Sequence, residues 1–551
     1  MIASLLAHAP APVLDKLPVP SIRYLSILPP MIMIGGAVVL LAVASLVSRP
    51  LRVRVSTLGT VIVSGGALGT SLWQWSDVQN HGAHTYIAHA VVMDGFSVLV
   101  NVLIASAMLL TALVSDGYLK REQVEGAEYH VLALVSASGA MLMGLANDLI
   151  IVFLGLEILS IALYVLTAFN HRRPSSGEAA LKYFILGGFS SAIFVYGIAL
   201  LYGATGSTNL TQIADFLSKN VLLTNGLLLA GLGLMLVGFA FKVAAVPFHM
   251  WTPDVYQGAP SPVTGFMAAV AKAGAFAAML RVLFSSLGVI SNDWRPIVYA
   301  LAVLSLVVGS VVALRQRDVK RMLAYSSINH AGFILLGVQS ASARGVSSSL
   351  YYLFAYTFMT IGSFAIITVL GGPGDRDHDL TGYKGLARRQ PLLALTFAIF
   401  LLAQAGAPFT IGLWAKLNVV LASVSAGSVP LAAIAMVTAV IAGFFYLRVA
   451  VLMYAADTES ADTQPPRPTD TGEPIRWASP DGVSGTVATL NAEIVMTGAV
   501  SSPKEPVVVR VPALTGLAIG LCLAVTVVFG VWPQPLLDFA KQATLLFLPL
   551  H

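Results

Sequence analysis

Residues 222–250 read LLTNGLLLAGLGLMLVGFAFKVAAVPFHM, an apolar run that contains a lysine, Lys242, and a proline, Pro247. The run is longer than the roughly 20 residues that one helix needs to cross a bilayer. Proline removes a backbone hydrogen bond from a helix, and a membrane tolerates such a break only inside protein or beside a wet cavity. A charge in the same run costs at least about 2.5–3.5 kcal/mol at the bilayer centre. The run therefore predicts a broken transmembrane helix with a functional lysine beside the break.

Residues 391–422 repeat this combination, with Pro408 inside the run and Lys416 after it. The 551 residues are 57% apolar and 10% charged, whereas soluble proteins carry about 25% charged residues. Further apolar runs that are long enough to span a bilayer lie at 28–48, 55–73, 95–115, 130–147, 149–169, 179–203, 261–284, 295–314, 321–338, 347–370, 429–454 and 511–531. We therefore expect an all-α polytopic membrane protein with about 14 transmembrane helices.

The two broken helices indicate an internal repeat. Each is the fourth in a set of five consecutive predicted helices, and the sets occupy residues 128–288 and 289–455. Because five is odd, the second set begins at the opposite membrane face, which predicts two inverted five-helix repeats of the kind that transporters use. The remaining parts are three N-terminal transmembrane helices in 1–127, a flexible cytoplasmic loop at 456–510, rich in Pro, Thr, Ser and Asp, and a last helix with its tail at 511–551.

The Lys and Arg residues of the loops predict the orientation. Cytoplasmic loops of membrane proteins carry an excess of these residues. The loops after the first, third and each further odd-numbered predicted helix hold most of the Lys and Arg residues. They include the group Arg315, Arg317, Lys320 and Arg321. The other side holds only Lys16, Arg23, Lys219, Arg281, Arg295, Arg344 and Lys541. We therefore expect both termini outside.

Five charged side chains fall inside predicted helices: Glu157, Lys182, Lys242, Lys272 and Lys416. Glu157 and Lys272 are too deep in their runs to reach the interface. Ionisable residues at such depth mark ion or proton paths, so we predict that the five form a proton relay. For Glu157 the alternative is a structural ion pair. Lys182 is only about one turn into its helix and could instead extend its amine to the interface.

Two histidines extend the predicted relay. His249 lies just beyond Pro247, and His330 follows Ser326 and Ser327 by about one helical turn. Imidazole can exchange protons near neutral pH, and neighbouring hydroxyl groups suit a chain of water molecules. For both histidines, a purely structural role in helix packing is the alternative.

The second broken helix carries a polar face. Side chains four residues apart lie on the same side of a helix, and here they are Gln404, Pro408, Gly412 and Lys416. We predict that Lys416 ends this face as the exit-side group. Extension to the interface is a weaker alternative for Lys416, because no Arg-rich loop lies near it.

Other kinds of chemistry find no support in the sequence. Cys522 is the only cysteine, so the chain has no internal disulfide and no cysteine-ligated iron–sulfur cluster. The sequence has no Walker A motif, no GxGxxG motif and no basic face for a nucleic acid. We therefore expect no cofactor or metal in this chain, no nucleic-acid partner, and lipids around it.

Three segments resemble a known family. FKVAAVPFHMWTPDVYQGAPSPV at 241–263, Lys272, and MLAYSSINHAG at 322–332 are similar to the antiporter-like subunits of respiratory complex I. The resemblance covers the predicted helices of 128–455. It implies the 14-helix core with inverted repeats, and a proton-pumping subunit of NADH:quinone oxidoreductase in a bacterial inner membrane. In such complexes other subunits bind NADH, FMN, the iron–sulfur clusters and quinone.

The resemblance also implies roles and partners. It makes Glu157 and Lys182 a pair between neighbouring helices, and matches other relay positions to Lys242, Lys272, His330 and Lys416. Of three paralogous types, a lysine at position 416 disfavours the M-type, and the short segment after the last helix disfavours the L-type. The N-type fits best. The expected partners are then an M-type neighbour and the small J- and K-type subunits.

Two other functions stay open at this point. A subunit of an Mrp-type cation/proton antiporter shares the same core. A membrane scaffold that no longer pumps would keep the fold but lose buried charges, whereas this chain keeps all five. The sequence departs from the family at residues 407–412, where APFTIG replaces the usual Pro-Pro followed by Ala-Gly-Phe.

Overall fold

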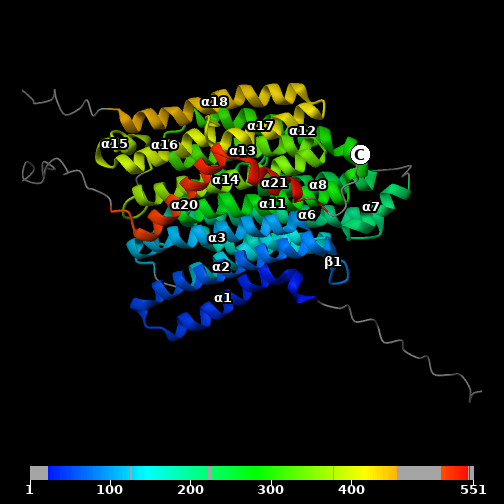
Figure 1. Cartoon of the computed structure of the whole chain (residues 1–551), viewed down its shortest axis with the longest axis horizontal. Coiled ribbons are helices and arrows are strands. Elements are labelled where there is room, and N and C mark those ends of the chain that lie inside the picture. The colour runs from blue at the N-terminus through cyan, green and yellow to red at the C-terminus, as the bar shows by residue number, and fades with distance from the viewer. Residues whose placement is uncertain are drawn as a thin grey trace, which may run out of the picture.

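Long helices lie side by side and form almost the whole molecule (Figure 1). The computed structural model describes residues 23–124, 127–220, 226–376, 378–455, 510–543 and 545. Within these residues, 12 helices are long and apolar enough to cross a membrane. The chain is therefore an all-α polytopic membrane protein, as the sequence predicts. The predicted loop at 456–510 lies outside the described residues, apart from Arg510.

The N-terminal part forms one edge of the molecule (Figure 1). A short antiparallel hairpin pairs Thr85 with Val92 and connects the second helix to the third. The elements are η1 (Tyr24–Ile27), α1 (Leu28–Leu46), α2 (Arg49–His81), β1 (His84–Tyr86), β2 (Val91–Met93) and α3 (Gly95–Glu122).

The next part contains the first predicted repeat. Its last transmembrane helix, Ser261–Ser285, is completely buried and contains a π-helical turn. The elements are α4 (Glu128–Leu145), α5 (Leu149–Thr167), α6 (Pro174–Thr205), α7 (Leu210–Lys219), α8 (Gly226–Val243), α9 (Trp251–Gly258), α10 (Ser261–Phe266), the π-helix η2 (Met267–Ala271) and α11 (Lys272–Ser285).

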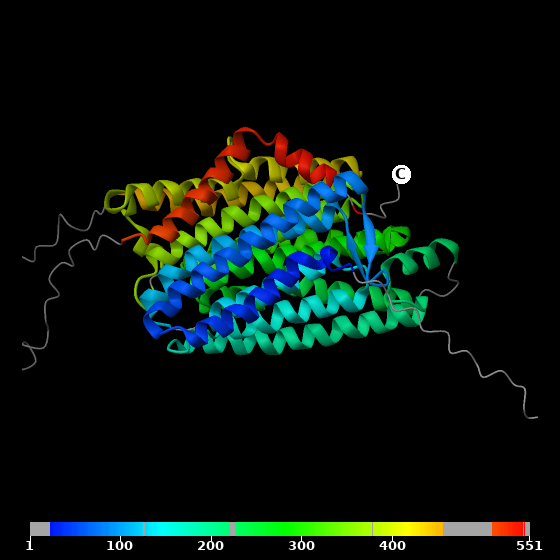
Figure 2. The same cartoon turned by 60° about the horizontal axis from the view of Figure 1, so that its bottom comes forward.

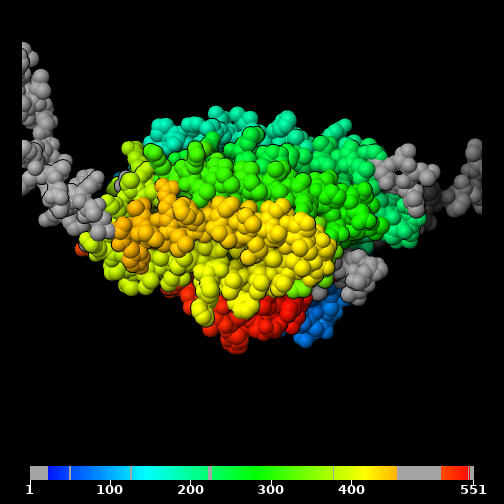
Figure 3. All heavy atoms as spheres, turned by 90° about the horizontal axis from the view of Figure 1, so that it is seen from above, coloured from blue at the N-terminus to red at the C-terminus, as the bar shows by residue number. Residues whose placement is uncertain are grey.

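The remaining part contains the second predicted repeat and the C-terminal helices. Figure 2 shows the last two helices, in red, along one side of the molecule, and Figure 3 shows the face formed by α18, in yellow and orange. The elements are η3 (Gly288–Ile290), α12 (Ser291–Ala313), α13 (Val319–Gln339), α14 (Ala343–Leu370), η4 (Leu380–Tyr383), α15 (Leu386–Arg389), α16 (Pro391–Ala405), α17 (Ile411–Ser425), α18 (Val429–Tyr454), α20 (Ala513–Val531) and α21 (Gln534–Gln542).

Both predicted helix breaks are present. α8 ends at Val243, four residues before Pro247, and α16 ends at Ala405, three residues before Pro408. α13, and α16 with α17, are not among the 12 candidate spans, although each corresponds to a predicted one. The total of 14 spans and the inverted relation of the two sets therefore stay predictions.

Glycine permits a close contact between α6 and α8. A Cβ atom on Gly231 would come within 2.9 Å of the Gly197 carbonyl oxygen, and one on Gly197 would come within 2.8 Å of the Met235 nitrogen. Small residues of this kind let helices in a membrane approach closely. Gly233 has open space beside it instead. Of Gly231 and Gly233, only Gly231 therefore lies at the contact between α6 and α8.

A buried ion pair joins α11 to the start of α3. Arg281 donates from Nη1 and Nη2 to the two carboxylate oxygens of Asp94, over 2.9 and 2.8 Å, and from Nε to the Gly144 carbonyl. Both charged side chains are at most 2% exposed. The sequence counted Arg281 among the loop charges of the outer side, whereas its guanidinium is buried inside the bundle.

We expect Arg281→Met to lower the stability of the protein by about 3–5 kcal/mol, because it leaves the buried Asp94 carboxylate without its cation. Thermal unfolding of the purified complex in detergent measures the effect. Arg344→Met, at an exposed site, is the control. A second substitution, Asp94→Asn, should recover part of the loss. If Arg281→Met melted like the parent, the pair would be dispensable.

Candidate functional site

The Lys242 side chain of α8 is buried against α5. Its amine donates to Ser160 Oγ over 2.6 Å and lies 3.4 Å from the Tyr164 hydroxyl. It also lies over the rings of Tyr164 and Tyr183, 5.4 and 5.5 Å from their centroids. Lys242 is 5% exposed. A buried cation without a carboxylate in contact is thus surrounded by hydroxyl groups and aromatic rings.

Glu157 is on the same side of α5 as Ser160 and Tyr164, because residues three and seven apart share a helix face. Its Oε1 atom is buried and has no hydrogen-bond partner among the described residues. Ser160, on this face, is the residue to which the Lys242 amine donates. The structure thus brings Glu157 to Lys242 as neighbours, without an ion-pair contact.

Lys182 lies elsewhere. Its side chain is 44% exposed in this chain, and its amine contacts Glu178 at 2.7 Å and Asp254 at 3.0 Å. The expectation that Lys182 is buried is therefore wrong for the chain by itself. The structure gives no ion pair between Lys182 and Glu157, because the amine reaches α9 instead of α5.

His249 follows the break after α8 and is partly buried. Its Nδ1 atom is buried and has no hydrogen-bond partner among the described residues. The structure brings none of the predicted lysines to it by a hydrogen bond or ion pair. Its role stays a prediction.

Lys272 is the first residue after the π-helical turn and is 3% exposed. Its amine donates to Ser327 Oγ over 2.6 Å and to the Ser327 carbonyl over 2.5 Å. The Tyr356 hydroxyl donates to the same Ser327 Oγ over 2.9 Å, and the Tyr256 hydroxyl lies 3.2 Å from it. π-helical turns often occur at functional sites. Ser327 therefore connects a central amine to two buried tyrosines.

His330 lies one turn further along α13 and is 1% exposed. Its Nδ1 lies 2.7 Å from the Tyr352 hydroxyl, and its Nε2 lies 3.0 Å from the Tyr446 hydroxyl. Tyr446 also hydrogen bonds Ser326. Ser327, to which the Lys272 amine donates, precedes His330 by three residues on α13, and Phe333, beside the Lys416 amine, follows it by three. The histidine thus lies between Lys272 and Lys416, with a hydroxyl on each ring nitrogen.

Lys416 reaches back to the second helix break. Its amine donates to the carbonyl of Ala405, the last residue of α16, over 2.7 Å, and lies 4.9 Å from the centroid of Phe333. Gly406 follows with φ +95°, and a Cβ atom there would lie 3.0 Å from the Lys416 side chain. The break therefore supplies both an acceptor for this amine and the space beside it.

Aromatic rings connect the first lysine to the second. Tyr183 stacks on Trp251, with centroids 4.6 Å apart, and Trp251 contacts Tyr256. Trp251 Nε1 donates to the Phe241 carbonyl at the end of α8. The connection from Lys242 to Lys272 thus passes through α9, the short helix after the first break.

The three buried lysines share one property. Within the described ranges, no carboxylate lies within 4.0 Å of the amine of Lys242, Lys272 or Lys416. Each amine can therefore lose and regain a proton without breaking an ion pair. In the same part of the chain, no group of three or more His, Cys, Asp or Glu gathers that could hold a metal ion.

Comparisons with known proteins identify the family. A family profile described as "NADH:quinone oxidoreductase/Mrp antiporter, TM" matches residues 146–442, which include all of the predicted relay residues. The chain belongs to this family.

Individual relatives of this NADH:quinone oxidoreductase/Mrp antiporter family cover most of the chain. The NADH-quinone oxidoreductase subunit N of Acidothermus cellulolyticus is 39% identical, over 96% of this chain and 97% of that protein. The protein of the same name from Trichlorobacter lovleyi is 46% identical, over 66% and 75% of the two chains.

Solved structures of the family have the same fold. A chain of respiratory complex I from Thermus thermophilus with bound aureothin is 29% identical, with a TM-score of 0.72, over 93% of this chain and 99% of that one. A chain of the Mrp complex from Dietzia sp. DQ12-45-1b has a TM-score of 0.78 at 23% identity, over 95% and 97% of the two chains. The second likeness shows the fold alone.

Sequence reasoning missed the buried tyrosines around the predicted relay residues. Their hydroxyls contact the predicted groups from other helices, and they are Tyr164, Tyr256, Tyr352, Tyr356 and Tyr446. Tyrosine in an apolar helix is common at interfaces and in packing, so the sequence gives no signal for a hydroxyl aimed at a lysine. Lys320 was missed for the opposite reason: it reads as a loop charge but is completely buried.

Proposed function

We propose that this chain is the N-type, antiporter-like membrane subunit of an NADH:quinone oxidoreductase and translocates protons. The observation that carries the proposal is the series of buried amines of Lys242, Lys272 and Lys416, each held by neutral oxygen atoms. The names of the curated relatives agree with it. The Mrp-type alternative has support only from the fold.

In this proposal, protons pass between side chains on different helices. Glu157 faces Lys242 on one side. Lys272 follows in the last helix of the first predicted repeat, and His330 and Lys416 follow in the second. Ser327 and Tyr446 supply hydroxyl groups that can accept one proton while giving another. The three amines gain and lose protons at Nζ, and His330 does so at a ring nitrogen. Lys182, at the edge of the bundle, takes part from outside this buried series.

The proposal places redox chemistry and its cofactors in other subunits. NADH, FMN, iron–sulfur clusters and quinone would bind there, and this chain would meet an M-type neighbour and the small J- and K-type subunits. The exposed apolar side chains of α18, such as Val440 and Phe444, would face lipid or such a neighbour. The distribution of Lys and Arg supports an orientation with both termini outside. The bacterial sources of the relatives support a bacterial inner membrane.

Glu157→Gln tests the proposed coupling. We expect it to lower quinone reduction and proton pumping together, because the amide cannot gain or lose a proton beside Lys242. NADH oxidation by an artificial electron acceptor should continue at the normal rate, since that reaction does not need the membrane part. Both activities and vesicle acidification are measured on the assembled complex.

Asp215→Asn, at an exposed site on α7, is the matched control and should change neither activity. If Glu157→Gln lowered both activities equally in fully assembled complex, Glu157 would be a structural residue. If it lowered neither, Glu157 would have no part in the relay.

A further inference from the structure

A cavity opens beside the start of α12, at the end of the bundle that carries α7 and the hairpin of β1 and β2 (Figure 1). Its volume is about 380 Å³. We call it the α12–α13 cavity, and it is lined by Asn292, Arg295, Pro296 and Tyr299 of α12 and by Gln339, the last residue of α13. Arg295 lies about 6 Å along the axis from the start of α12. A long side chain at this depth can reach the layer of lipid head groups.

Backbone carbonyls hold the guanidinium of Arg295 in one position. Its Nε donates to the Gln339 carbonyl over 3.0 Å, and its Nη2 donates to the Ala426 carbonyl over 3.3 Å. These carbonyls lie at the ends of α13 and α17, so the arginine also caps two helices. Nη1 makes no hydrogen bond within the described residues and is not enclosed. One edge of the guanidinium therefore stays available, and such an edge can bind two oxygens of one phosphate.

Neutral donors border the same cavity. Gln339 is only 4% exposed, and its side-chain amide makes no hydrogen bond within the described residues. Its Oε1 atom is fully covered whereas Nε2 is not, so Nε2 can donate into the cavity. The Tyr299 hydroxyl and the Asn292 amide are also without a partner in the part of the chain that the structure describes. Asp293, the nearby carboxylate of α12, does not line the cavity. The lining therefore suits an anion.

Two arginines bring uncompensated positive charge to this region. Arg344 is exposed at the start of α14 and donates to the Ser425 hydroxyl over 2.9 Å. Ser425 precedes Ala426, whose carbonyl Arg295 contacts, so both arginines lie at the end of α17. Neither forms an ion pair within the described ranges, whereas Lys219, at the same end, lies 2.7 Å from a carboxylate. The charge beside the cavity is thus free to attract an anion from outside the chain.

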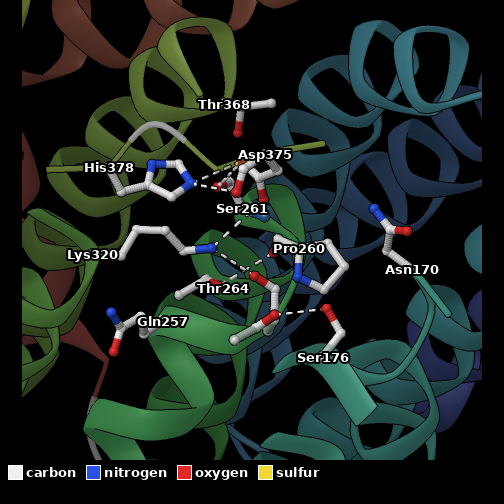
Figure 4. Close-up of polar contacts among 12 residues, drawn as sticks. Asn170, Ser176, Gln257, Pro260, Ser261, Thr264, Lys320, Thr368, Asp375 and His378 are labelled. Atoms are coloured by element: carbon white, nitrogen blue, oxygen red, sulfur yellow. Dashed lines mark hydrogen bonds and ion pairs between the residues drawn. The ribbon is translucent and has the colours of Figure 1, made fainter. Parts of the chain in front are cut away.

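Charges at the opposite end of the bundle neutralise one another instead. There the buried Asp375 accepts from the nitrogen and the hydroxyl of Ser261 and lies 3.6 Å from Lys320 (Figure 4). His378 Nε2 lies 3.1 Å from the same carboxylate, and Arg173 lies 3.2 Å from it. Each of these cations already has a carboxylate in contact. The α12–α13 cavity differs because its cations have none.

The exposed face of α12 continues from the cavity as an apolar stripe. Its residues follow at intervals of three or four and therefore share one side of the helix; they are Ile297, Ala300, Leu304, Val307 and Val311, all exposed. The other sides of α12 pack on α13 and α18. The stripe runs for about 21 Å along the helix axis, which is enough to cross one leaflet of about 15 Å. A cationic cavity thus lies directly above an apolar surface of acyl-chain length.

We propose that the α12–α13 cavity binds the head group of an anionic phospholipid, with the phosphate on Arg295 and an acyl chain along the α12 stripe. Gln339 and Tyr299 donate to the remaining oxygens, and Arg344 adds attraction. A free phosphate ion would meet the same donors, but only a lipid also buries CH₂ groups on the stripe. The inference goes beyond the proposed function, because binding of a lipid requires only that the chain spans a membrane.

A photoreactive phosphatidylglycerol tests the site in the assembled complex. The probe carries a diazirine in the middle of one acyl chain, and labelled peptides are identified by mass spectrometry after irradiation. We expect label on the stripe, at Leu304 or Val307, and competition by unlabelled phosphatidylglycerol. Phosphatidylcholine with the same chains should compete about tenfold more weakly, because its head group has no net charge to attract the two arginines. Inorganic phosphate should not compete.

Arg295→Gln tests the phosphate contact. The amide loses the charge and the free edge, so we expect the affinity for the probe to fall about tenfold or more, as on loss of a hydrogen bond to a charged group. Arg295→Lys keeps the charge without the planar fork and should give an intermediate affinity. Arg23→Gln, at the same end but bonded to Tyr86 of the hairpin, is the control and should bind like the parent.

Arg344→Gln, at an exposed position, should weaken binding by a smaller factor. It also tests the inference if Arg295→Gln does not assemble, because it contacts the chain only through the Ser425 hydroxyl. Subunit content of the purified complex shows whether each variant assembles. Unchanged affinity in every assembled arginine variant would overturn the inference.

The label separates the other occupants of this surface. Label on a neighbouring subunit and none on α12 would mean that a protein covers the stripe, and would overturn the lipid site. Equal competition by inorganic phosphate would reduce the site to one for small anions, and equal competition by phosphatidylcholine would exclude the role of net charge. The Lys272→Met complex should bind the probe like the parent, so the lipid site and the proposed function can fail independently.

Discussion

Lys272→Met is expected to stop proton pumping in an otherwise assembled complex. Methionine fills a similar volume but cannot carry a proton, and Ser327 keeps its contacts with Tyr256 and Tyr356. Loss of a positioned proton donor costs about a hundredfold or more in rate. Acidification of reconstituted vesicles during NADH oxidation measures the effect.

Lys219→Met is the matched control for Lys272→Met, because it removes an exposed lysine and should leave pumping unchanged. Assembly is checked by the subunit content of the purified complex. Pumping at the parental number of protons per NADH in Lys272→Met would exclude Lys272 from the relay and, with it, the proposed function of this chain.

Lys416→Arg is expected to block transfer nearly as well as Lys416→Ala. Arginine keeps the positive charge and can still donate to the Ala405 carbonyl, but it does not deprotonate in proteins. Lysine and arginine thus differ here in proton release alone. The initial rate of proton release from vesicles, compared among the parent, Lys416→Arg and Lys416→Ala, measures the difference.

Lys541→Arg, on the exposed side of α21, should pump normally and shows whether a general effect of arginine is present. An arginine at position 416 that pumped at the parental rate would mean that Lys416 acts as a fixed charge. The proton would then have to leave the protein through another residue.

The sequence predicted the membrane helices well, because an apolar run of sufficient length has few other uses. It also predicted both breaks, since Pro247 and Pro408 each lie inside such a run. It could not predict the partner of Lys182. That lysine lies at the end of a helix from which its long side chain can reach either α5 or α9, and only packing decides between them.

The sequence predicted the charged residues of the candidate site, but not the neutral hydroxyl groups that contact them. A lysine in an apolar run is conspicuous at Lys272, whereas the hydroxyl of Tyr446 depends on the direction of its helix. The contact between Asp375 and Ser261 was also hidden, because the two residues are far apart in sequence and each is ordinary in a loop. The fully buried position of Lys320 follows from the same long-range contact.

The positions of the three buried amines determine how membrane voltage acts on the protein. Lys242 and Lys416 lie beside the two helix breaks, and Lys272 lies near the centre of the Ser261–Ser285 span. In the proposed relay, a proton that passes between them moves mostly parallel to the membrane plane. One charge that crosses the whole membrane works against about 2.3 kcal/mol per 100 mV. Nearly all of that work falls on uptake and release, so a rise in voltage slows these two steps and leaves the lateral transfers almost unaffected.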